Sequence, residues 1–336
     1  MKSVFAAGRS NVLIPVVLVL VAAFLANASV ASADQFQAVA GAQSHDKGKQ
    51  VLAFLPNELW IHEGDSVQWS FPTDERHTVT FLTSGQVRPK FQTGCPGSTP
   101  DGSSYDGSTC VNSDVLIGGP TYTVTFPKPG NFKLACLVHL YMTGTVHVLG
   151  LAENLPFDQT YYDRQAHNER HELMSDASGL EARGQAIAER TSATEVVAGI
   201  ADVVATTGGG AQSSAVMRFL NDRIVVNVGD TVEWTNLAVG ASHTVTFGTE
   251  PADPFAPASA NVTTDHDGAL HAVIGSPTDS VHSGLFSPAP GERTGAAQAP
   301  LGVTRFRVTF TAPGTFRYIC ALHDDEGMVG TVVVLR

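Results

Sequence analysis

Basic residues and long apolar runs are both scarce in this sequence. Lysine and arginine total 20 against 32 aspartate and glutamate residues, so the formal net charge is −12. Because nucleic acids are bound through positive charge, and no long basic run occurs, nucleic acid is not an expected partner. Beyond the N-terminal segment, no apolar run reaches the length of a membrane span. The composition is otherwise that of a folded chain, and 336 residues predict two domains.

The one long apolar run lies at the N-terminus. Lys2 and Arg9 precede the apolar stretch 12–25, and the small residues 31–33 follow it. This pattern is typical of a secretory signal peptide over residues 1–33, cleaved before Asp34. Cleavage removes two positive charges and no acidic ones, which takes the net charge from −12 to −14. We therefore expect a secreted, periplasmic or cell-envelope protein. The alternative is an uncleaved anchor, and membrane contact is expected in that case alone.

Cysteine is also scarce, and the four cysteines are of two kinds. Cys95 and Cys110 flank a loop rich in Gly, Ser and Asp, which has too little apolar surface to fold alone. In an oxidising compartment a disulfide between them would stabilise the fold by about 3 kcal/mol, and two free thiols are the alternative. Cys136 and Cys320 have no such partners. Each follows a β-type run and precedes a histidine by three positions.

The sequence repeats itself. Residues 51–81 align with residues 216–247, and both segments contain a Gly-Asp turn, a tryptophan and the pentapeptide HTVTF. Farther along, FPKPGNFKLAC at 126–136 has the same Phe, Pro-Gly, Phe and Cys spacing as FTAPGTFRYIC at 310–320. Two copies of one domain are therefore present.

Each copy has the pattern of a β-sandwich. Short alternating runs such as TYTVTF at 121–126 and TRFRVTF at 304–310 are separated by Gly, Pro and Asp turns. Several such strands in each copy predict an all-β fold of two Greek-key sandwiches. FQAVAG, beginning at Phe36, and TEVVAG, beginning at Thr194, mark the first strand of each copy. The predicted domains are residues 34–150 and 194–336.

The segment between the copies differs in composition. Residues 156–190 are rich in Ala, Glu, Gln and Arg and poor in β-branched residues, which predicts a helical connector within 151–193. Two helices, broken near Ser178 and Gly179, are the alternative to one continuous helix. His167 and His171 stand four residues apart, on one face of the predicted helix. A solvated helix face is the expectation for this pair, and a shared metal ion is the alternative.

Cysteine, histidine and methionine occur together near the end of each copy. CLVHLYM begins at Cys136, CALHDDEGM begins at Cys320, and each HTVTF supplies one more histidine. Two imidazoles and a thiolate, with a weak axial thioether, form the ligand set of an electron-transfer copper site. The soft thiolate suits Cu(I), whereas imidazole suits both oxidation states. The predicted ligands are His77, Cys136, His139 and Met142 in the first copy and His243, Cys320, His323 and Met328 in the second.

These motifs resemble the cupredoxins, the blue copper proteins related to plastocyanin, pseudoazurin and amicyanin. The Cys-x2-His-x2-Met spacing at Cys136 is similar to amicyanin, and the Cys-x2-His-x4-Met spacing at Cys320 is similar to plastocyanin and pseudoazurin. The resemblance implies two Greek-key cupredoxin β-sandwiches, joined by the helical connector. It also implies one type 1 copper ion in each copy and one-electron transfer.

The function that we expect is that of an exported electron carrier without catalytic residues. Copper nitrite reductases and multicopper oxidases are one alternative, since they too resemble tandem cupredoxins. These enzymes place a histidine beside the copper-binding cysteine, but neither Cys136 nor Cys320 has a neighbouring histidine, and no His-x-His pair occurs. Copper storage or delivery is the other alternative. Such proteins favour Met-rich or His-rich tracts, and this chain has five methionines.

The resemblance also implies how the sites exchange electrons. His139 and His323 are expected to be partly exposed, as the edges through which electrons pass. His77 and His243 are expected to be more buried, each held by a hydrogen bond that fixes its tautomer.

The ligand loops predict redox partner proteins of two kinds. The first loop would present an apolar docking patch, made of Leu137, Val138, Leu140 and Tyr141. The second loop has acidic residues in the corresponding place, which are Asp324, Asp325 and Glu326. We therefore expect a more basic partner for the second copy.

Overall fold

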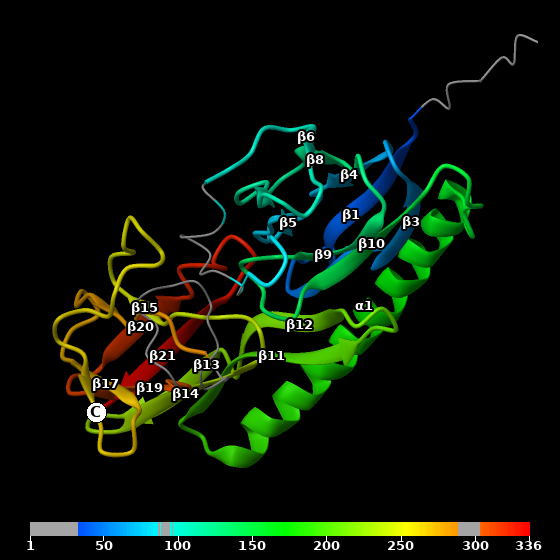
Figure 1. Ribbon diagram of the computed structural model, residues 1–336. Helices are drawn as coiled ribbons and strands as arrows, with labels where there is room; N and C mark the ends of the chain where they lie inside the picture. Colours follow the sequence, from blue (N-terminus) through cyan, green and yellow to red (C-terminus); the bar gives the residue numbers. More distant parts are fainter. Residues whose placement is uncertain (1–32, 87, 89–94, 96, 288–302) are drawn as a thin grey trace, which may run out of the picture. The chain divides into compact units, whose positions relative to one another are not determined.

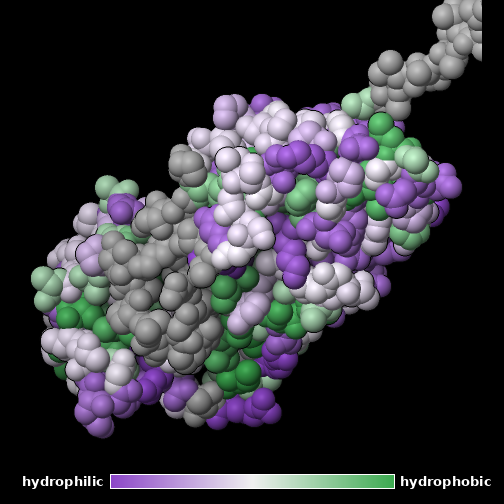
Figure 2. Space-filling view, viewed as in Figure 1, coloured by the Kyte–Doolittle hydropathy of each residue, from purple (hydrophilic) through white to green (hydrophobic). Residues whose placement is uncertain are grey.

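The computed structural model describes residues 33–86, 88, 95, 97–287 and 303–336. The predicted signal peptide lies outside the described residues, apart from its last position. Among the described residues, no helix has both the length and the apolar character needed to cross a membrane. On the face drawn in Figure 2, hydrophilic residues are spread over most of the described surface, with smaller hydrophobic groups among them.

The first copy is built from two layers of strands. One layer is a five-stranded sheet in the order β3 (Glu58–His62), β10 (Thr143–Leu149), β9 (Gly130–Ala135), β5 (Thr80–Phe81) and β7 (Val111–Asn112). The other layer contains β2 (Lys49–Leu55), β1 (Gln35–Gln43), β4 (Ser66–Ser70), β8 (Thr121–Thr125) and β6 (Ser103–Ser104).

The second copy repeats this arrangement. Its five-stranded sheet has the order β13 (Arg223–Asn227), β21 (Val329–Leu335), β20 (Gly314–Ile319), β15 (Thr246–Phe247) and β18 (Val281–His282). Its other layer contains β12 (Ala211–Leu220), β11 (Glu195–Ala205), β14 (Thr231–Ala238), β19 (Arg305–Phe310), β17 (Leu270–Ile274) and β16 (Thr263–Thr264). The predicted all-β class and the two β-sandwiches are confirmed.

Alternating residues of each strand fill the core between the layers. In β14 every second residue is buried, as expected for a strand with one face against the core. The two tryptophans of the repeat, Trp69 and Trp234, are completely buried and contact Phe81 and Phe247 at centroid distances of 5.8 and 5.7 Å. The shared tryptophan and HTVTF motifs thus mark equivalent places in two similar cores.

The two copies share one sheet. β12 pairs with β2 in antiparallel register, so that Val51 lies opposite Ser214 and Val216 lies opposite Lys49. Val51 and Val216 are equivalent residues of the repeat, so equivalent strands meet and the pairing is close to two-fold symmetric. The result is an eleven-stranded sheet that runs through both copies, and residues 33–336 form one compact unit.

The helix α1 (Gln159–Thr191) lies against this shared sheet and runs beside β11 and β12 (Figure 1). Asp158 caps its start by accepting a hydrogen bond from the Tyr161 amide at 2.9 Å. Leu173, Ala177 and Leu180 are buried on the side that faces the strands. The helix is continuous through Ser178 and Gly179, so the alternative of two helices is wrong. The cost of an exposed helical glycine is only about 1 kcal/mol, and packing on a rigid sheet offsets it.

Candidate metal centres

Each upstream histidine is fixed by a short bridge between two strand segments. The His77 amide donates to the Leu116 carbonyl, and the Leu116 amide donates to the His77 carbonyl, at 3.2 and 2.9 Å. His243 and Phe286 make the same pair of bonds at 3.2 and 3.0 Å. Both imidazoles are fully buried. The backbone therefore places one histidine of each HTVTF motif deep inside its copy.

A glycine in the first strand of each copy makes room for this imidazole. Gly41 has φ +80° and Gly199 has φ +77°, and each lies at a register shift in its strand pairing. A Cβ atom on Gly41 would lie 2.3 Å from His77 Nε2, and one on Gly199 would lie 2.2 Å from His243 Nε2. Glycine is required at each position for two reasons: any other L-residue would be strained at this φ, and a Cβ atom would clash with the imidazole.

The cysteine of each centre follows a strand, β9 or β20, and is held by the threonine of HTVTF. The Thr78 amide lies 3.4 Å from Cys136 Sγ, and Thr78 Oγ1 accepts the Leu137 amide at 2.8 Å. In the second copy the Thr244 amide lies 3.3 Å from Cys320 Sγ, and Thr244 Oγ1 accepts the next amide at 2.8 Å. Both sulfur atoms therefore receive a backbone N–H and are fully buried.

The downstream histidine and methionine close the ligand loop over the cysteine. The Cys136 amide donates to the Met142 carbonyl at 2.9 Å, and the Cys320 amide donates to the Met328 carbonyl at 3.0 Å. Both methionine side chains are fully buried in the same core cluster as the neighbouring cysteine. This places the two methionines beside the centres, and ligation by their sulfur atoms stays a prediction.

Three predicted ligands come together in each copy. The ligand atoms of His77, Cys136 and His139 lie within 4.8 Å of one another, and so do those of His243, Cys320 and His323.

The short distances within these clusters involve ring nitrogens and sulfur. His139 Nδ1 lies 3.7 Å from Cys136 Sγ, and His323 Nδ1 lies 3.3 Å from Cys320 Sγ. In the second copy the two Nδ1 atoms are 3.1 Å apart. Ligands of one small ion, with bonds of roughly 2.0–2.3 Å, have separations of this size.

The chemistry of these donors fits copper. Nδ1 of His77 is buried without a hydrogen-bond partner, as expected of a ring nitrogen whose partner is a metal ion. Burial alone would raise the pKa of each thiol, but the adjacent imidazoles hold the pKa of Cys136 and Cys320 well below its usual range. A thiolate with two imidazoles is a ligand set that copper prefers.

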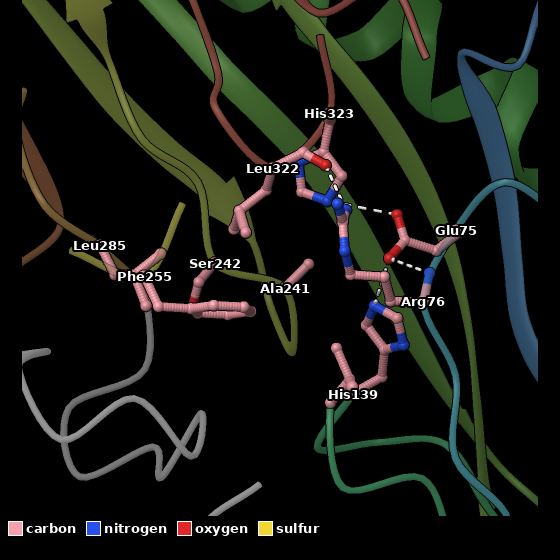
Figure 3. A pocket seen from close by; sticks show the side chains of 10 residues that line it. Glu75, Arg76, His139, Ala241, Ser242, Phe255, Leu285, Leu322 and His323 are labelled. Atoms are coloured by element: carbon pink, nitrogen blue, oxygen red, sulfur yellow. Dashed lines mark hydrogen bonds and ion pairs between the residues drawn. The ribbon is translucent and has the colours of Figure 1, made fainter. Parts of the chain in front are cut away.

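The downstream histidines do not reach the surface. His139 and His323 are each only 3% exposed, so the expectation that their edges are partly exposed is wrong. They face a small pocket lined by residues of both copies, and Glu75 lies between them (Figure 3). Its Oε1 is 3.4 Å from His139 Nε2, and its Oε2 is 3.2 Å from His323 Nε2.

Parts of both predicted docking surfaces are buried. Leu137 is buried, and the other three residues of the predicted apolar patch are at most partly exposed. Val138 and Leu322 line the pocket between the copies, because the apolar surface around the ligand loops is used to join them. Glu326 is also buried, at 3% exposure, and burial raises its pKa to about 7. It is therefore not part of an acidic docking surface.

Other predicted features have mixed outcomes. The disulfide between Cys95 and Cys110 is present. His77 and His243 are the more buried pair, as expected, but neither Nε2 atom has the predicted fixing hydrogen bond, since Gly41 and Gly199 pack against these atoms instead. His167 and His171 are exposed on α1. In the described part of the chain, no third cluster of His, Cys, Asp or Glu has metal-binding spacing.

Several residues of the centres were missed by sequence reasoning, although most left a signal. The glycines end the repeated VAG of the first strands, and the threonines follow the histidines of HTVTF. Ser113 and Ser283 accept the amides of Val79 and Val245 at 2.9 and 2.8 Å. Each serine lies three residues before the strand partner of its histidine, in SDVL and SGLF, a further weak repeat. Glu75 left no such signal.

Comparison with known proteins identifies the family. Residues 40–149 and 205–335 match the copper binding proteins of the plastocyanin/azurin family. No curated protein sequence matches the chain. Among solved structures, a mutant amicyanin in the Cu(I) form is 17% identical, with a TM-score of 0.24, over 34% of this chain and 82% of amicyanin.

Two further solved structures are similar to parts of the chain. Plastocyanin from Dryopteris crassirhizoma is 22% identical, with a TM-score of 0.22, over 42% of this chain and 99% of that protein. A purple cupredoxin from Nitrosopumilus maritimus is 18% identical, with a TM-score of 0.24, over 34% and 99%. Since the family match covers both copies and most of the sequence, the chain belongs to the plastocyanin/azurin family of copper-binding proteins.

Proposed function

We propose that this protein is an exported carrier of single electrons with two mononuclear type 1 copper sites. The observation that carries the proposal is the pair of buried His-Cys-His clusters, one in each copy. Copper would be held by His77, Cys136 and His139 in the first copy, with Met142 as the weak fourth ligand. The corresponding ligands in the second copy are His243, Cys320, His323 and Met328. Bound copper would supply a one-electron couple between Cu(I) and Cu(II).

The surrounding residues support electron transfer rather than catalysis or ion delivery. Every ligand residue is at most 3% exposed, and backbone amides hold both sulfur atoms. A rigid, dry site limits rearrangement when one electron moves, whereas a delivery site must open to release its ion. A catalytic copper would also need an open position for substrate. Export follows from the N-terminal pattern of residues 1–33 and remains part of the proposal.

The test is the copper stoichiometry together with the visible and paramagnetic-resonance spectra of the full chain. Two copper ions with intense thiolate absorption are expected in the wild type. Cys136→Ser and Cys320→Ser should each remove about half of that absorption. One copper ion in the wild type, or weak absorption with ordinary hyperfine splitting, would contradict the proposal and favour copper handling or catalysis.

For partners, we propose redox proteins with a basic surface. The net charge of −12 and the exposed Asp325, with Asp324 partly exposed beside it, favour such a partner near the second ligand loop. The double variant Asp324→Asn/Asp325→Asn should slow electron exchange with a basic partner at low salt and flatten its dependence on ionic strength. Glu153→Gln, which removes a distant acidic residue, is the control. Equal salt dependence in all three proteins would reject this docking site.

A further inference from the structure

Glu75 forms ion pairs with ligand histidines of both copies. Its carboxylate is 1% exposed, and its two oxygens lie 3.4 Å from His139 Nε2 and 3.2 Å from His323 Nε2. Figure 3 shows the carboxylate between the two rings, which approach it from different copies. A buried carboxylate with one oxygen for each centre is not needed by either cupredoxin alone.

This contact determines which nitrogen of each imidazole ring faces the carboxylate and which is free to bind metal. A carboxylate can only accept a hydrogen, so these ion pairs place a hydrogen on each Nε2 atom, and a metal ion at the centre would take the place of the hydrogen on Nδ1. The lone pair is then on Nδ1, the atom that lies near Cys136 Sγ in one ring and near Cys320 Sγ in the other. One anion therefore holds both histidines in the tautomer that binds metal through Nδ1.

The two copies diverge at this point. Ala241 is the counterpart of Glu75, and Ser242 is the counterpart of Arg76. Glu75 and Ala241 both line the pocket between the copies, so a second glutamate would add another buried anion there, at high cost. Arg76 also crosses between the copies, since its Nη1 donates to the Leu322 carbonyl at 2.6 Å. The contact between the copies is thus nearly symmetric, but the first copy supplies a carboxylate where the second has an alanine. The hydrogen bond of Arg76 holds the segment that carries this carboxylate.

We propose that Glu75 couples the two copper centres, so that the charge at one centre changes the reduction potential of the other. This inference rests on the proposed function, which requires copper at both sites. Oxidation adds one positive charge to a centre, and this charge strengthens the hold of its histidine on the shared carboxylate. The other histidine is then held less strongly. Oxidation of the second centre is therefore harder than oxidation of the first.

The first test needs no copper. In the full chain loaded with diamagnetic Zn²⁺, nitrogen NMR of the histidine rings should show His139 and His323 with the hydrogen on Nε2. Glu75→Ala should shift the Nε2 resonances of both residues, while those of His77 and His243 are unaffected. A change at only one of the two residues, or at neither, would show that Glu75 does not join the sites. This result stands whether or not the protein carries electrons.

The second test is the reduction potential of each centre. In Cys320→Ser the first centre is measured alone, and in Cys136→Ser the second is measured alone. In each of these variants, adding the isosteric Glu75→Gln should raise the reduction potential, because it removes an anion that stabilises the more positive, oxidised form of the centre. We expect a shift on the order of tenfold in each oxidation equilibrium, about 59 mV.

The matched control is Glu326→Gln. Glu326 is another buried acid of the second ligand loop, and above about pH 8 it is charged despite its raised pKa, so its replacement should change the second potential alone at that pH. In the two-copper protein, the potential of each centre should differ from its value in the single-site variant, and Glu75→Gln should reduce that difference. Potentials in the two-copper protein that equal the single-site values would overturn the coupling. Normal spectra in Glu75→Gln would show that the variant folds.

Discussion

At the residue scale, the centres depend on small side chains as much as on ligands. The fully buried ring of His77 lies against Gly41, at a φ that only glycine adopts without strain. Gly199 has the same relation to His243. Thr78 then uses its hydroxyl to hold the amide that follows Cys136. Backbone geometry thus fixes the position of each ligand before any metal is bound.

Gly41→Ala should damage the first centre alone. Its new Cβ would lie 2.3 Å from His77 Nε2, so the ring must move away from Cys136. We expect about half of the thiolate absorption to be lost, and a loss of about 1–3 kcal/mol in stability from backbone strain. Gly199→Ala should produce the same change at the second centre. The measurements are copper content, visible spectra and thermal unfolding.

Gly64→Ala separates strain from steric contact. Gly64 has φ +92°, but nothing lies within 4 Å of a Cβ atom there. It should lose a similar amount of stability while keeping both copper sites. Full copper content in Gly41→Ala, or loss of copper in Gly64→Ala, would show that the clash with His77 is not what matters.

At the scale of elements, α1 does more than connect the copies. Glu169 on this helix accepts the Asn57 amide of the first copy and the Gln212 side chain of the second, both at 3.1 Å. Gln165 donates to its other oxygen at 2.8 Å. Burial raises the pKa of Glu169 despite these bonds, so the charged carboxylate is less stable in the folded chain than in the unfolded chain. The helix therefore joins both copies through one partly desolvated acid.

Glu169→Gln should leave stability at pH 7 unchanged or raise it by up to about 1 kcal/mol, because a neutral amide avoids the cost of burying charge. Glu169→Ala should instead lose about 1–3 kcal/mol, since buried donors lose their acceptor. The pKa of Glu169 is higher in the folded chain than in the unfolded chain, so the wild type gains stability as the pH falls through the folded-state pKa. The advantage of Glu169→Gln should therefore shrink towards pH 4.5. Urea unfolding at several pH values measures this, and an advantage that grows in acid would contradict the argument.

Elements with local signals could be predicted from the sequence. The repeat, the ligand loops and a helix between the copies all follow from spacing and composition. The continuity of α1 does not follow from them. Gly179 is a local helix-breaking signal, and packing on the shared sheet, which the sequence does not show, outweighs it. Burial of His139 was also mispredicted. Its apolar neighbours indicate a docking surface, and the sequence does not tell whether an outside partner or the other copy covers it.

At the scale of the whole molecule, the copies are joined by three kinds of contact. β12 extends the sheet of β2, α1 covers the junction, and Glu75 and Arg76 reach across beside the ligand loops. None of these contacts is local in sequence, so no motif predicts them. Because strands of both copies share hydrogen bonds in one sheet, we expect the two centres to be lost together when the protein unfolds.

Ser214→Pro tests this cooperativity. Ser214 lies within β12, opposite Val51, and proline in the middle of a sheet removes an amide donor and distorts the strand, at a cost of about 3 kcal/mol or more. Wild-type protein should lose both copper signals in one thermal transition, whereas Ser214→Pro should unfold at lower temperature and lose the signals in two steps. Ser214→Ala is the control, because both variants remove the hydroxyl that donates to the Leu173 carbonyl at 2.8 Å but only proline removes the amide. If Ser214→Pro keeps a single transition at the temperature of Ser214→Ala, the shared sheet is not what makes the two copies unfold as one.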